Sequence, residues 1–163
     1  PDVFSKLVVP EAFPLDIIYE DNDVIVVKKP PGMPVHPATG RQRGTLVNAL
    51  IDQYPEIENI GEPNRPGIVH RLDTDTSGVM VIARSETAYL LLSRQFSKHT
   101  VSKTYIALVF GNLEPPVGII DAPIGRHPKQ RTKMGVIDGG RRSETEYSTL
   151  RKFDGHTPLE VHP

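Results

Sequence analysis

Proline is the residue that most limits how this chain can fold. The sequence contains sixteen prolines among 163 residues. A proline ring fixes φ and removes a backbone donor, so prolines at this density favour short elements joined by ordered turns over a helical bundle. The segment 30–44 alone holds four prolines and three glycines in fifteen residues. We expect this rigid loop to shape a surface or a cleft.

Hydrophobic periodicity between the prolines predicts both strands and helices. The predicted elements are strands at 23–29, 78–84 and 100–111 and helices at 46–54 and 86–99. Thr45 and Ser85 each precede one of the helices, where a hydroxyl can cap the first turn. Because strands and helices are mixed without a regular β-α-β alternation, we predict an α+β fold.

Composition excludes several classes of protein and site. The absence of cysteine excludes disulfides, thiolate metal sites and cysteine nucleophiles, and it fits a reducing compartment. The chain has no apolar run near the roughly 18 residues of a membrane span and no signal-peptide pattern. We therefore expect a cytoplasmic monomer that contacts no membrane. Residues 1–14 are predicted to be a linker, and residues 15–163 one domain.

The stretch GIVHRLDTDTSGVMVIAR, residues 67–84, permits two interpretations. Asp73, Asp75 and Ser77 carry oxygen ligands at the spacing that opens an EF-hand calcium loop. The twelfth position of such a loop requires a bidentate glutamate, and here it is Arg84. The residues that follow form an apolar, β-branched run that predicts a buried strand and not a helix. The EF-hand interpretation is therefore rejected.

The second interpretation is a carboxylate held beside an arginine. In an extended chain, Arg71 and Asp73 lie on one face and His70 on the other. A neighbouring guanidinium keeps a carboxylate ionised, and an ionised aspartate serves as a nucleophile or a base. The residues alone favour a structural ion pair over a catalytic one, and a hydrogen-bonded core histidine over a ligand. No HxH or HExxH spacing supports a metal site.

Positive charge gathers in one segment although the net charge of the chain is only −1. The basic residues of this segment are Arg126, Lys129, Arg131, Lys133, Arg141 and Arg142. A local anion site and a solvated loop both explain such a cluster. Arg41 and Arg43 lie just before the helix predicted at 46–54, where they and the helix N-terminus would make a phosphate site; a plain surface loop explains them equally well.

Four stretches of the chain, in order, resemble the RluA family of RNA pseudouridine synthases. They are IYEDNDVIVVKKPPGMPVHP, GIVHRLDTDTSGVMVIAR, SKTYIALVFG and DAPIGRHPKQRTKM. The resemblance runs from about residue 15 to the C-terminus. It implies an α+β domain with a mixed, mostly antiparallel bent sheet, flanking helices and a central cleft. It also implies a reaction that breaks the N-glycosidic bond of a uridine in RNA and rejoins the base through C5.

The resemblance further implies roles for individual residues. Asp73 matches the essential aspartate, Arg71 the arginine that pairs with it and holds the uridine out of the stack, and Tyr105 the tyrosine that packs on the uracil. It implies no cofactor and no metal. Whether Asp73 attacks the base, attacks C1′ or removes a proton from C2′ stays open. The RNA partner is expected to be ribosomal, with transfer RNA possible. The predicted RNA contacts are His70, Arg41, Arg43, Arg126, Lys129, Arg131 and Lys133.

One departure from the family pattern bears on activity. The chain ends at HTPLEVHP, where the family continues into a third motif with a further basic residue. We therefore expect a C-terminally incomplete domain that exposes a sheet edge and is weakly active or inactive by itself. The alternatives are an RNA-binding module of the same fold without activity, and a glycoside hydrolase, which would need two flanking carboxylates.

Overall fold

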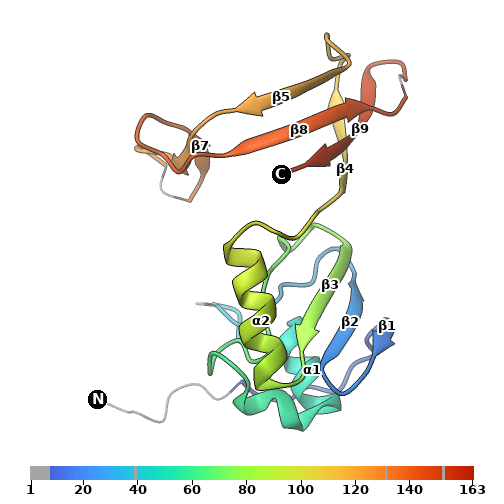
Figure 1. Cartoon of the computed structure of the whole chain (residues 1–163), viewed down its shortest axis with the longest axis vertical. Coiled ribbons are helices and arrows are strands. Elements are labelled where there is room, and N and C mark those ends of the chain that lie inside the picture. The colour runs from blue at the N-terminus through green and yellow to red at the C-terminus, as the bar shows by residue number, and fades with distance from the viewer. Residues whose placement is uncertain (1–7, 39, 131, 152) are drawn as a thin grey trace. The chain divides into compact units, whose positions relative to one another are not determined.

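The computed structural model of the chain describes residues 8–38, 40–130, 132–151 and 153–163, which form two compact units (Figure 1). The first unit ends at Thr100 and the second runs from Val101 to Pro163. Helices and antiparallel strands are both present, which confirms the predicted α+β class.

The first unit is built on a three-stranded antiparallel sheet. Strands β1 (Ile17–Glu20), β2 (Val24–Lys29) and β3 (Gly78–Ala83) lie in the order β1-β2-β3. The predicted strands at 23–29 and 78–84 are thus confirmed. Alternate residues of β2, namely Ile25, Val27 and Lys29, are buried, as period two requires.

Two α-helices and a short 3₁₀ helix complete the first unit. Helix α1 (Leu46–Gln53) leads into η1 (Pro55–Asn59), and α2 (Glu86–Ser97) packs beside β3 (Figure 1). Both predicted caps are present: the hydroxyl of Thr45 accepts from the amide of Asn48, and that of Ser85 accepts from the amide of Ala88. Among the described residues, no helix has both the length and the apolar character of a membrane span.

The described part of the predicted linker packs on α1. The side-chain amide of Asn48 donates to the carbonyl of Val9 at 2.7 Å, and its backbone carbonyl accepts from the amide of Glu11 at 3.0 Å. The carboxylate of Glu11 in turn accepts from the amide of Gly44 at 2.7 Å. These bonds join residues 8–11 to the end of the proline-rich loop and to the helix behind it.

The second unit consists of antiparallel strands. Its four-stranded sheet has the order β4 (Tyr105–Phe110), β9 (His156–His162), β8 (Glu144–Thr149) and β5 (Val117–Asp121). Strands β6 (Ile124–Arg126) and β7 (Met134–Val136) form a separate hairpin. The predicted strand at 100–111 is confirmed over β4, with Tyr105 half-buried and Phe110 88% exposed on the opposite face.

The end of β2 is tied to two loops by a buried ammonium group. The side chain of Lys29 is 0% exposed, although lysine is rarely buried. Its Nζ donates to the carbonyls of Pro30 at 3.0 Å, Met33 at 2.8 Å and Thr74 at 3.0 Å. An ammonium group has three donors, so all of them are used. One side chain therefore fixes the start of the proline-rich loop to the turn that follows Asp73.

A glycine brings the segment with Asp73 against the sheet. Gly67 has φ of +69°, and a Cβ at this position would lie 2.7 Å from the carbonyl oxygen of Ala83. A hydrogen bond also joins the two residues, because the amide of Ala83 donates to the carbonyl of Gly67 at 2.9 Å. Both the backbone conformation and the close approach require glycine here.

We expect replacement of Lys29 by methionine to destabilise the first unit strongly. The change leaves three partly buried carbonyls without their donor, at about 1–3 kcal/mol for each that water cannot reach. Urea denaturation should show a loss of about 3–5 kcal/mol. Lys28→Met is the matched control, because Lys28 is the adjacent residue and is exposed. Equal stabilities of the two variants would contradict the structural role of Lys29.

Gly67→Ala should destabilise the chain more than Gly32→Ala. Both glycines have positive φ, +69° and +80°, so each alanine costs about 1–2 kcal/mol in backbone conformation. A Cβ at Gly32 meets no atom within 4 Å, whereas at Gly67 it also clashes with backbone. The clash should add roughly 1–3 kcal/mol to the loss in denaturant unfolding. Equal losses would show that the close approach at Gly67 is not tight.

Candidate active site

The segment between Gly67 and β3 presents Asp73 on an irregular turn. Ile68 makes one bridge to Ile82 of β3, and the chain then leaves the sheet. The carbonyl of Asp73 accepts from the amide of Thr76 at 3.1 Å, which closes the turn. Leu72 is buried while Arg71 and Asp73 are exposed. This alternation of exposure is the one predicted for an extended chain, although the segment is not a strand.

The ion pair predicted between Arg71 and Asp73 is not formed. Among the ion pairs of the described residues, none joins these two side chains. The physical reason is exposure, because neither charge loses enough hydration to require the other. The cation whose pKa is affected by the charge of Asp73 is instead Lys29. Burial lowers the pKa of Lys29, and the negative charges of Asp75 and Asp73 oppose that shift.

The ring of His70 makes two structural contacts, a hydrogen bond at one nitrogen and a stacking contact on one face. Its Nε2 accepts from the amide of Val81 at 3.0 Å, and the ring stacks on Phe96 with centroids 4.4 Å apart. One ring nitrogen is thus used to hold the segment against β3. The RNA contact expected of His70 stays a prediction, since this bond occupies Nε2.

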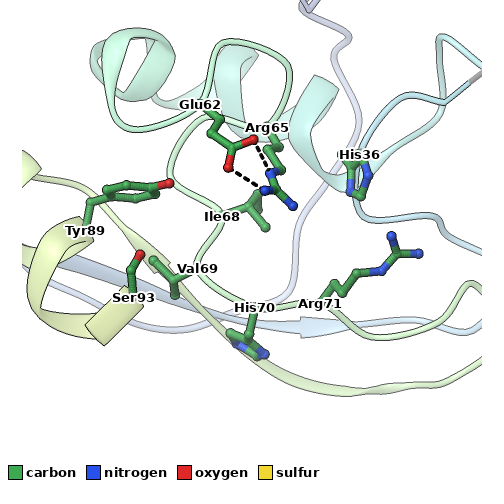
Figure 2. A pocket seen from close by; sticks show the side chains of 9 residues that line it. All are labelled: His36, Glu62, Arg65, Ile68, Val69, His70, Arg71, Tyr89 and Ser93. Carbon is green, nitrogen blue, oxygen red and sulfur yellow. Dashed lines mark hydrogen bonds and ion pairs between the residues drawn. The ribbon is translucent and has the colours of Figure 1, made fainter. Parts of the chain in front are cut away.

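A pocket of ≈ 260 Å³ lies beside Arg71 and His70 (Figure 2). It is lined by His36, Glu62, Arg65, Ile68, Val69, His70, Arg71, Tyr89 and Ser93. Glu62 and Arg65 form a bidentate ion pair in its wall, with Nε of Arg65 2.8 Å from the carboxylate. Burial lowers the pKa of His36, as do the charges of Arg71 and Arg65, while that of Glu62 raises it. Burial, the largest of these effects, favours the uncharged imidazole of His36.

Arg41 and Arg43 are exposed, but the helix N-terminus next to them is not free. The amides of Leu46 and Val47 donate to carbonyls of the proline-rich loop, those of Pro34 and Val35, at 2.9 and 3.0 Å. Thr45 and Asn48 satisfy the other amides of this end through a capping box. The predicted phosphate site at the helix terminus is therefore wrong, and the two arginines alone stay as candidates.

The proline-rich loop does shape a recess, as predicted. It lines a pocket of ≈ 370 Å³ together with Phe13 and Arg41. The rest of the lining is made of small or rigid residues: Pro30, Pro31, Gly32, Met33 and Gly44. The backbones of Ala38 and Arg41 form two hydrogen bonds with each other, each 2.9 Å long. These bonds fix the backbone from which the Arg41 side chain starts.

Part of the basic segment after β5 lies on a hairpin in the second unit, here named the basic hairpin (residues 124–136). Arg126, Lys129 and Lys133 are exposed on it, and Arg131 lies outside the described residues. Nδ1 of His127 accepts from the amides of Lys129 and Gln130 at 3.2 and 3.1 Å, which orders the turn. These bonds order the backbone at Lys129, whose side chain is exposed.

Tyr105 is the first residue of β4 in the second unit, where it pairs with Val161. Its side chain is half-buried. Its proposed contact with uracil stays a prediction, because Asp73 belongs to the other unit.

Sequence reasoning missed several residues of the site, and one of them had a readable signal. Lys29 lies two residues after the buried Val27 in β2, so the alternation of a strand predicts that it is buried as well. Glu62, Tyr89 and Ser93 come from separate segments and carry no pattern that predicts their meeting. Within the described residues, no group of three or more histidine, aspartate or glutamate side chains could hold a metal ion.

Comparison with known proteins assigns the family. Residues 23–163 match the sequence profile of RNA pseudouridylate synthases. The chain is 46% identical over 149 residues to a protein of Nitrosomonas europaea named ribosomal large subunit pseudouridine synthase D, covering 91% of this chain and 42% of that relative. It is 44% identical over 160 residues to an uncharacterized RNA pseudouridine synthase of Bacillus subtilis, covering 98% of this chain and 53% of the relative.

Solved structures give the same result. The human RNA pseudouridylate synthase domain-containing protein 4 is 25% identical, with a TM-score of 0.69 over 91% of this chain and 58% of that one. The human domain-containing protein 1, at 24% identity, shares the fold with a TM-score of 0.74 over 92% of this chain and 59% of that one. The chain spans about half the length of the curated relatives it matches. On the sequence match and on the fold, this chain belongs to the RNA pseudouridylate synthase family.

Proposed function

We propose that this protein converts uridines in structured RNA to pseudouridine. In this isomerisation the bond from N1 of the base to C1′ of the ribose breaks, the base turns, and a bond from C5 to C1′ forms. The proton on C5 is lost and N1 gains one, so no atom is gained or lost overall. Asp73 is the proposed catalytic carboxylate, with Arg71 and Tyr105 as the proposed partners at the flipped uridine.

The observation that carries this proposal is the family match over residues 23–163, which includes the whole segment around Asp73. The local geometry is consistent with it. Asp73 is an exposed carboxylate on a turn whose backbone is fixed by the buried Leu72 on one side and by the bond from Lys29 to Thr74 on the other. A reacting group needs this combination of access and fixed position.

Reaction at a ribose inside folded RNA requires the uridine to leave the stack. This extrusion costs a few kcal/mol, which contacts to the RNA backbone must offset. Exposed cations supply such contacts without reading sequence. Arg41, Arg43 and the basic hairpin are the candidates. Arg71, exposed and not paired with Asp73, is available for RNA as well.

Ribosomal RNA is the proposed substrate, because relatives in five organisms carry the name ribosomal large subunit pseudouridine synthase D. Transfer RNA is the second candidate. A cytoplasmic location and a monomeric state are also proposed; the absence of cysteine from the sequence fits a reducing compartment.

Asp73→Asn should abolish isomerisation and leave RNA binding in place. The change keeps the size of the side chain and removes the charge, so the rate should fall by about 10²–10⁴-fold or more. Tritium release from RNA labelled at C5 of uridine measures the reaction, and filter binding measures the complex. The whole protein is the material to test.

Asp75→Asn is the matched control, since Asp75 is exposed in the same turn and also acts on Lys29. It should lose far less activity than Asp73→Asn, because it keeps the carboxylate of Asp73. Binding of RNA without tritium release from the unsubstituted protein would instead indicate a non-catalytic RNA-binding module. Release of free uracil would indicate a glycoside hydrolase.

Removal of charge from the basic hairpin should flatten the salt dependence of RNA binding. In Lys129→Ala/Lys133→Ala the slope of log K against log[salt] should fall by about 1 for each lost phosphate contact. Arg142→Ala is the control, because Arg142 already pairs with Asp121 and Glu144 at 3.7 and 3.2 Å. A slope unchanged by the double substitution would place the hairpin outside the RNA interface.

A further inference from the structure

The pocket of ≈ 260 Å³ beside Arg71 is separate from the proposed catalytic carboxylate. Arg71 lines it and Asp73 does not. Only the buried Leu72 separates Arg71 from Asp73, so the pocket and Asp73 lie close along the backbone. A nucleotide bound in the pocket would therefore be a neighbour of the one at Asp73.

Several polar groups of the pocket have unused hydrogen-bonding capacity. The hydroxyls of Tyr89 and Ser93 have no hydrogen-bond partner among the described residues. Figure 2 shows the Tyr89 hydroxyl pointing toward the pair of Glu62 and Arg65, with Arg71 on the other side of the space. The carboxylate of Glu62 accepts two bonds from Arg65 and has about two further acceptor positions.

The size of the pocket suits one flat polar group. At roughly 30 Å³ per water molecule it holds several waters, and it is smaller than the roughly 300–1,000 Å³ of a site for a drug-sized ligand. Its volume fits a nucleobase better than a whole nucleotide. The apolar side chains of Ile68 and Val69 line it together with the ring of Tyr89, which offers a face for a base.

The polar groups on the Glu62 side of the pocket suit the edge of a base. A phosphate could bind Arg71, but beside Glu62 it would meet a negative carboxylate that is already paired with Arg65. A base has both donors and acceptors on its edge, as this wall has. An amino group of adenine, cytosine or guanine can donate to Glu62, and ring nitrogens or carbonyls can accept from the hydroxyls of Tyr89 and Ser93. Uracil carries no amino group.

The position of Tyr89 is fixed by a glycine. Gly61 has φ of +76°, and a Cβ there would lie 2.3 Å from the Tyr89 ring. The ring therefore packs directly on the backbone of the loop that carries Glu62. This contact holds the wall of the pocket in place before any ligand binds, which limits the entropy lost on binding.

We propose that this pocket binds the unstacked base of a nucleotide next to the target uridine and prefers a base with an exocyclic amino group. The pocket thus acts as a specificity site for the proposed RNA-modifying function, on which the inference rests. Sequence-specific proteins commonly read single-stranded RNA through the edges of splayed bases.

The test uses a pool of RNA hairpins that contain one loop uridine between randomised loop positions. Two sequence preferences are read: that of RNA bound by the whole protein carrying Asp73→Ala, and that of uridines converted by the protein with Asp73 intact. At one position beside the uridine, uracil should be selected against by at least about fivefold. Tyr89→Phe, Ser93→Ala and Glu62→Gln should each reduce that preference at this position only.

Two controls remove the same chemical groups elsewhere in the first unit. Tyr19→Phe changes an exposed tyrosine of β1, and Ser97→Ala changes the last residue of α2, on the helix that carries Ser93. Both should keep the preference. Because Glu62→Gln also alters the pair with Arg65, the two hydroxyl variants test the pocket without disturbing an ion pair.

The outcomes separate this inference from the proposed function. A preference in the bound pool that the pocket variants remove, without any pseudouridine formed, would support the base site and refute the enzymatic function. Pseudouridine formation with preferences unchanged by all three variants would overturn the base site and leave the enzymatic function standing. No preference in either pool would overturn the base site.

Discussion

The ammonium group of Lys29 is the contact on which the arrangement around Asp73 depends. Its three hydrogen bonds join the last residue of β2 to Pro30 and Met33 of the proline-rich loop and to Thr74 of the turn. A buried cation is costly, and only a full set of acceptors with nearby negative charge makes it stable. Here Asp75 and Asp73 supply that charge. The same carboxylate that is proposed to react with RNA thus also stabilises the group that holds its backbone.

The bonds of Lys29 also hold the proline-rich loop in place. Its prolines limit the conformations of the loop before folding, and Lys29 then fixes one end of it while Leu46 and Val47 at the start of α1 bind the carbonyls of Pro34 and Val35. The helix amides that might have bound phosphate are therefore used to hold the loop. This explains why the arginines at 41 and 43 stand exposed without support from the helix terminus.

Sequence reasoning predicted the elements whose signals are local. The strands β2, β3 and β4 follow from apolar runs in the sequence, and the hydroxyls of Thr45 and Ser85 cap the two α-helices as predicted. Contacts between distant segments could not be read in this way. The pocket joins residues from 36 to 93, and no composition change marks the division after Thr100. The absence of an Arg71–Asp73 pair likewise depends on exposure, which adjacency in the sequence does not determine.

The segment around Asp73 shows how irregular backbone can hold an exposed side chain, here the proposed catalytic carboxylate, at a defined place. In a strand, the amides of this segment would donate to neighbouring strands, and Asp73 would lie among the side chains on one face of the sheet. The turn instead uses isolated anchors: Gly67 against Ala83, His70 on Val81, Leu72 in the core and Thr74 on Lys29. These anchors alternate with Arg71 and Asp73, so each exposed side chain lies between two fixed residues. The anchors limit the freedom of the backbone between them, while the side chains of Arg71 and Asp73 stay exposed. The proposed reaction with a base that leaves the RNA stack needs both conditions.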